Sequence, residues 1–130
     1  TVVRLADGRL VLFGAVALKP QEQRALERFG APAYLVIPSA SYCEQARQVK
    51  ARFPELSVIA PAGVKEKLEP LLRVDDTSVE FDDASVRLVA IPGTAGSEVA
   101  LLVETAAGLA LVVHELISYL SEDGERDADC

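Results

Sequence analysis

The stretch at 91–117, "IPGTAGSEVALLVETAAGLALVVHELI", decides how the second half of this chain folds. A Gly-rich turn comes first, and two apolar runs follow at 98–104 and 109–113. Because a short break containing a glycine separates the runs, the pattern predicts a β-hairpin. His114, the only histidine of the chain, and Glu115 follow the second run directly. Catalytic and binding residues often lie where strands end, so this pair marks a candidate site.

The rest of the chain alternates between strand and helix patterns. Strands are expected at 2–5, 9–16, 33–37, 56–60, 79–81 and 86–91. Helices are expected at 20–29, 40–53 and 62–68. Pro20 suits a first helical turn, and Gly30 suits the position just after a helix. This order predicts the α/β (α+β) class, with mixed β-sheet layers flanked by helices in a single domain over residues 1–121.

Composition and charge exclude several classes of partner. The net charge is −7, with an acidic and mobile tail expected at 122–130, so nucleic acid is not an expected partner. The apolar runs are too short to cross a bilayer, so no membrane is expected either. Two cysteines favour the cytoplasm, and we expect no obligatory disulfide between Cys43 and Cys130. The acid pairs at 75–76 and 82–83 are expected to face water.

The turn at 92–97, Pro-Gly-Thr-Ala-Gly-Ser, the hairpin after it and the pair at 114–115 together resemble the metallo-β-lactamase-like superfamily. Members of this family carry a Pro-Gly-His-Thr-x-Gly-Ser turn and later a Gly-Asp pair at a strand end. They also carry a metal-binding His-x-His-x-Asp-His loop, which would fall on 39–44. The resemblance covers roughly residues 10 to 120. It implies an αββα sandwich, here truncated before the helix and strand that normally supply the last histidine.

The departures from the family pattern concern its metal ligands. The vestigial ligand positions are Ser39, Ser41, Cys43, Glu44, Thr94 and Glu115. No histidine stands in the loop, and either Thr94 or a one-residue gap takes the place of the turn histidine. The longer Glu115 stands in for the aspartate and would put its carboxylate in a different place. A hydrolytic zinc site needs three or more ligands and an open position. We therefore expect no metal and no other cofactor, in a degenerate or uncharacterised branch of the superfamily.

Each candidate residue also has a structural interpretation. Ser41 and Glu44 have the spacing of a capping box, in which both side chains bond the backbone at a helix start. Cys43 fits a small packing residue, although a helix N-terminus can lower the pKa of a thiol. His114 fits a hydrogen-bonded structural residue at a strand end. The glycines of the turn fit backbone geometry.

Two functional hypotheses follow. The favoured one is a non-catalytic binding or interaction domain, a pseudoenzyme on a metallo-β-lactamase-like scaffold, because fold does not carry function with it. The alternative is a residual hydrolase that uses a weak single metal such as zinc near His114 and Glu115, or the thiol of Cys43. If catalysis survives, these three side chains and Ser39 converge within hydrogen-bond or ligand distance.

The sequence also predicts a homodimer. If the chain lacks the family's last helix and strand, the strand at 109–113 lies near a sheet edge with apolar surface exposed. Such edges promote pairing between chains, and monomers rarely tolerate large apolar patches. We therefore expect the 109–120 region to contribute to a contact between two copies. No small-molecule ligand is identified by the sequence.

Overall fold

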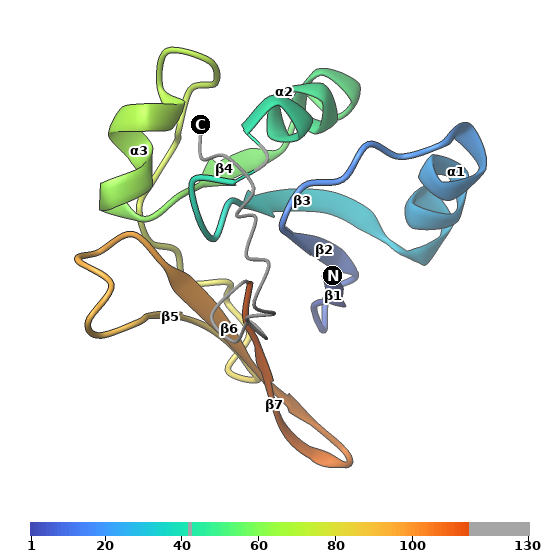
Figure 1. Cartoon of the computed structure of the whole chain (residues 1–130). Helices are drawn as coiled ribbons and strands as arrows, with labels where there is room; N and C mark the ends of the chain where they lie inside the picture. The colour runs from blue at the N-terminus through green and yellow to red at the C-terminus, as the bar shows by residue number, and fades with distance from the viewer. Residues whose placement is uncertain (42, 115–130) are drawn as a thin grey trace, which may run out of the picture.

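The computed structural model describes residues 1–41 and 43–114, which form three helices and two sheets (Figure 1). Sheet A contains β1 (Val2–Arg4), β2 (Arg9–Phe13), β3 (Ala31–Val36) and β4 (Ser57–Ile59). Sheet B contains β5 (Val86–Ala90), β6 (Val99–Thr105) and β7 (Gly108–Val112). The helices are α1 (Pro20–Phe29), α2 (Cys43–Arg52) and α3 (Ala62–Leu68). The expected class, helices combined with a mixed sheet, is confirmed.

The two sheets differ in how their strands are connected. In sheet A, β1 and β2 form an antiparallel hairpin, whereas β2, β3 and β4 run parallel in that order. Parallel neighbours need a crossover, and α1 and α2 supply the two crossovers. Sheet B is an antiparallel meander of β5, β6 and β7. Sheet A therefore carries the alternating first half of the chain, and sheet B carries the hairpin-rich second half.

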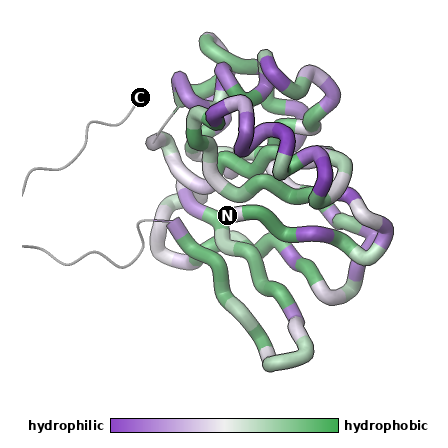
Figure 2. The backbone as a smooth tube through the Cα atoms, turned by 90° about the vertical axis from the view of Figure 1, so that its right-hand side faces the viewer, coloured by the Kyte–Doolittle hydropathy of each residue, from purple (hydrophilic) through white to green (hydrophobic). Residues whose placement is uncertain are grey.

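Sheet A is the middle layer, with the helices on one face and sheet B on the other (Figure 1). Strand β2 shows why, since successive side chains point to opposite faces. Leu10 and Leu12 pack into the cluster that contains the helices, whereas Val11 and Phe13 pack into the cluster shared with sheet B. A strand buried on both faces reads as a continuous apolar run, and Figure 2 shows the hydrophobic strands beneath the more polar helices.

Helix α1 has the bounds that the sequence predicts. Pro20 occupies its first position, where a missing N–H costs nothing. The Glu22 carboxylate accepts a hydrogen bond of 2.7 Å from the backbone N–H of Lys19, which satisfies a donor at the helix start. Gly30 follows the last turn, and its N–H donates to the carbonyl of Leu26 at 3.2 Å. The bounds expected for α3 are confirmed as well.

Several expected elements are shorter than the sequence suggested. Strand β2 ends at Phe13, because Gly14 adopts a φ of 79° and turns the chain away. Helix α2 begins at Cys43, because the segment before it passes the start of sheet B, where the carbonyl of Pro38 accepts from Val99 N–H at 3.4 Å. The strand expected at 79–81 was wrong, since only an isolated bridge forms there.

The position of Glu115 and the acidic tail at 122–130 fall on residues that the structure does not describe. Within residues 1–41 and 43–114, no helix is long and apolar enough to span a membrane.

Candidate functional site

Hydrogen bonds and a cavity join, pair by pair, the segments that carry the ligand positions implied by the resemblance. The contact between Val99 and Pro38 joins the segment at 37–41 to the start of β6. The N–H of Gly63 in α3 donates to the carbonyl of Gly96 at 2.9 Å, which holds the turn at 92–97 against that helix. We call this region the loop edge: residues 37–41, the first turn of α2, the turn at 92–97, and the end of β7 with His114.

The serines and the cysteine of the loop edge are embedded in local structure. Ser39 is buried, and its hydroxyl accepts a hydrogen bond of 3.4 Å from the backbone N–H of Ser41. Cys43 is buried in the core cluster under the helices. The described part of the chain contains no free cysteine, so it offers no thiol nucleophile. The expectation about a disulfide to Cys130 falls outside the described residues.

Glu44 has a partner that the predicted capping box does not include. Its carboxylate accepts from the Arg47 guanidinium at 2.8 Å, an exposed ion pair one helical turn along α2. Because α2 begins at Cys43, the position before the helix falls on residue 42, which the structure does not describe. The capping role of Ser41 therefore stays a prediction.

The turn at 92–97 uses its own polar groups to hold its shape. The Thr94 hydroxyl donates to the carbonyl of Ile91 at 2.8 Å, and the Ser97 hydroxyl donates to the carbonyl of Thr94. Gly93 and Gly96 have φ values of 84° and 71°, a region that favours glycine. The backbone role expected for both glycines is confirmed. Thr94, which stands at the place of the family's turn histidine, closes the turn.

His114 lines a cavity of about 490 Å³, which we call the loop-edge pocket. The other principal walls are the segment at 13–17, which follows β2, together with Val113 and Gln45 of α2. Ligands of α/β sheets often bind beyond the carboxyl ends of parallel strands, and this pocket lies at the carboxyl end of β2. Its volume falls in the usual range for small-molecule sites.

The described residues do not fit the ligand set that the resemblance implies. Among residues 1–41 and 43–114, no three His, Cys, Asp or Glu side chains are grouped so that they could hold a metal ion. The loop-edge pocket brings His114 close to Gln45, whereas Ser39 and Cys43 are not among its described lining residues. Glu115, the remaining acidic candidate, lies outside the described residues. The convergence that catalysis requires is therefore not found among the described candidates.

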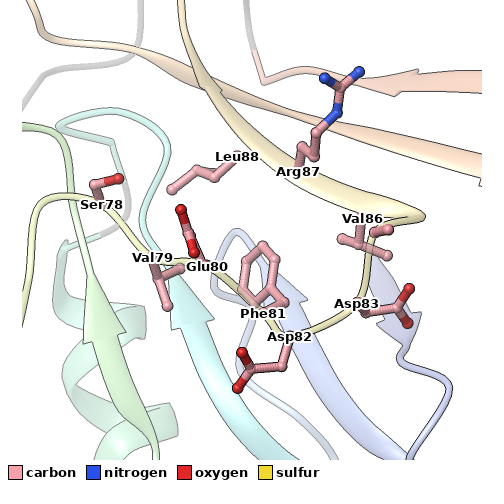
Figure 3. Close-up of a pocket in the computed structure, with 10 residues that line it drawn as sticks. Ser78, Val79, Glu80, Phe81, Asp82, Asp83, Val86, Arg87 and Leu88 are labelled. Carbon is pink, nitrogen blue, oxygen red and sulfur yellow. The ribbon is translucent and has the colours of Figure 1, made fainter.

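A second cavity, of about 470 Å³, is lined by residues 78–84 and by 86–88 of β5, where Glu80 forms a bridge to Arg87 (Figure 3). Its inner wall is Phe81, whose ring packs edge-on against Tyr34 with 5.1 Å between the ring centroids. Arg9 donates to the carbonyl of Phe81 and to the Tyr34 hydroxyl, both at 2.9 Å. Arg9 thus ties sheet A to the segment that leads into sheet B.

Asp83, expected to face water together with Asp82, is half-buried and also has hydrogen-bond partners within the chain. Its carboxylate accepts from the Ser85 hydroxyl at 2.5 Å, the Ala6 N–H at 2.8 Å and the Ser85 N–H at 3.0 Å. These hydrogen bonds, that of the Ser85 hydroxyl first, lower the pKa of Asp83. Asp82 is exposed, as expected. The signal that was missed is Asp-x-Ser, a spacing that lets a carboxylate bond the backbone two residues on.

No protein-family model matches this chain, and neither does any curated protein or solved structure. The relationship to the metallo-β-lactamase-like superfamily therefore stays a prediction that depends on the turn at 92–97 and on the order of the strands.

Proposed function

We propose that this chain is a non-catalytic binding or interaction domain on a metallo-β-lactamase-like scaffold that has lost its metal site. One observation carries the proposal: side chains at the vestigial ligand positions serve the local structure. Thr94 closes its own turn, Glu44 pairs with Arg47, and Ser39 is buried against the backbone. A loop edge whose polar side chains hold the fold in this way can bind a partner through its shape and its apolar surface.

The loop-edge pocket is the place where we propose that a small ligand binds. Ala15, Val16, Ala17 and Val113 give it apolar walls, and Gln45 offers both a donor and an acceptor. Burial of apolar surface contributes roughly 25 cal/mol per Å², and one polar group then fixes orientation. Thr1 and His114 line the same pocket, so the walls favour a molecule with an apolar body and polar groups that can meet Gln45 and His114.

Nuclear magnetic resonance of the protein with labelled alanine methyl groups and side-chain amides tests this proposal. Titration with small aromatic amides should shift the Ala15 and Ala17 methyl signals and the Gln45 amide signal in a saturable way. The methyl signal of Ala51, at the exposed far end of α2, is the internal control. Val16→Phe, at an exposed wall position that leaves every reporter group in place, should fill the pocket and abolish the shifts.

The proposal fails if the pocket signals stay unchanged at saturating probe, or if they shift equally in the Val16→Phe variant. Zinc-dependent hydrolysis of ester or phosphoester substrates that disappears in His114→Ala would instead favour the alternative. That alternative is a residual hydrolase with a weak single metal near His114 and Glu115, and the position of His114 in the pocket is what favours it. A Cys43 thiol mechanism gains no support, because Cys43 is not a free thiol. The cytoplasmic location stays a prediction.

A further inference from the structure

Sheet B has an inner face that packs on sheet A and an outer face that points away from it. Val86, Leu101 and Val112 belong to the inner cluster. Since side chains alternate along a strand, the neighbouring residues point outward. Ala100, on the outer side of β6, is buried and bounds the open area. We call the rest the outer face: Arg87, Val89, Leu102, Glu104, Leu109 and Leu111.

The outer face is apolar at its centre and on the β7 side. Leu109 and Leu111 are each 62% exposed, and Val89 is 36% exposed. The strand register places Leu102 between Leu111 and Arg87 in one row across the sheet. In Figure 1 the β6–β7 hairpin extends beyond the body of the molecule, so this face is open to a large partner. Contiguous apolar surface of this kind marks interaction sites.

On strands β5 to β7 the same face carries one positive and one negative side chain, Arg87 and Glu104. Arg87 points away from Phe81 and the core, as Figure 3 shows, and the exposed Glu80, its bridge partner, lies beside it. Glu104 lies on β6, opposite Leu109 of β7. Neither Arg87 nor Glu104 belongs to an ion pair among the described residues. A surface with charges of both signs can pair with a copy of itself, because a two-fold contact brings residue i to residue j and j to i.

We propose that a second copy of this chain packs on the outer face about a two-fold axis that lies between the two faces. On an ideal sheet, with about 4.8 Å between strands and about 3.4 Å per residue, the registers fix where each outward residue lies. The axis that sets Arg87 opposite Glu104 of the second copy also sets Leu109 opposite Val89 of the second copy. The same axis places Leu102 opposite Leu102 of the second copy, and Leu111 opposite Leu111 of the second copy.

This arrangement pairs every residue of the outer face with a complementary one. The strands of the two copies cross at a steep angle, as in the orthogonal class of sheet packing. The net charge of −7 opposes association only weakly at physiological salt, where screening acts over about 8 Å. Of the region expected to contribute, 109–120, only Leu109 and Leu111 enter this contact, and 115–120 lies outside the described residues. The proposal does not depend on the function of the loop-edge pocket.

Charge reversal on the full chain tests the contact. Sedimentation equilibrium over a concentration series should show a dimer for the unchanged protein. Arg87→Glu and Glu104→Arg, each alone, place like charges together and should raise the Kd of the dimer by about tenfold or more. The double variant restores two opposite pairs and should return the Kd to within about threefold of the original. Arg73→Glu, an exposed charge reversal off this face, is the matched control and should change nothing.

Three outcomes would overturn the proposal. The first is a monomer for the unchanged chain, which would mean that the chain itself or another partner covers the face. The second is a dimer that both single reversals leave intact. The third is a double variant that stays as weak as the single variants, since reciprocal pairing requires rescue. Because Arg73, Arg87 and Glu104 are all exposed, circular dichroism should show the same fold for each variant.

Discussion

At the scale of single residues, polar side chains with more than one backbone contact connect the two sheets. Asp83 joins the turn before β5 to Ala6 in the β1–β2 hairpin, and Arg9 joins β2 to Phe81. Asp83 stands in an acid pair that was expected to face water, and Arg9 belongs to no motif that suggests chemistry. Their partners lie far along the chain, since Ala6 and Asp83 are 77 positions apart and Arg9 and Phe81 are 72 positions apart.

Asp83→Asn should lower the free energy of unfolding at neutral pH and lose that effect in acid. The folded-state pKa of Asp83 is lowered by its hydrogen bonds, so its contribution is present above the unfolded pKa. That contribution disappears as the pH falls through the folded value, below about 4. Urea unfolding of both proteins across this pH range measures the difference. Glu55→Gln, at an exposed carboxylate, is the control, and an equal effect there would contradict the role given to Asp83.

At the scale of elements, the sequence predicts well wherever local signals agree. Pro20 and Gly30 bound α1 as expected, because a proline and a glycine restrict the backbone without help from distant residues. The segment at 79–81 looks like a strand, since its apolar residues are buried. It forms only a bridge, because Asp82 turns the chain with a φ of 55° before a ladder can form. Tertiary contacts of this kind have no signature in a local window.

Gly30→Ala should destabilise the protein by about 1–3 kcal/mol through overpacking. A Cβ at position 30 would lie 2.3 Å from the backbone oxygen of Gly8 and 2.7 Å from the Leu10 side chain. The extended φ of Gly30 suits any residue, so the cost comes from this close approach of α1 to the β1–β2 turn. Thermal unfolding measures it. Gly63→Ala is the comparison, because a Cβ at position 63 would lie 3.0 Å from its nearest atom, the backbone oxygen of Gly96. This variant should lose less stability than Gly30→Ala, and a larger loss would refute the explanation.

At the scale of the whole molecule, a middle sheet covered on both faces follows from the apolar run in β2 and was predictable as a layered fold. The candidate site was predictable only in part. The resemblance led to the loop edge, of which Gln45 and His114 line one pocket. The loop-edge pocket was not foreseen, because Ala15, Val16 and Ala17 carry no chemical signature and approach Gln45 and Val113 only in the fold.

Metal stoichiometry tests most directly the claim that this scaffold has lost its metal site. The full chain should be expressed with added zinc, manganese and iron, desalted, and measured by plasma mass spectrometry beside a His114→Ala variant. Ser39, Glu44 and Thr94 serve local structure, and the described residues bring no three candidate ligand side chains together, so we predict far less than one transition metal per chain in both proteins. About one or more bound zinc, iron or manganese per chain, lost in the His114→Ala variant, would contradict the account.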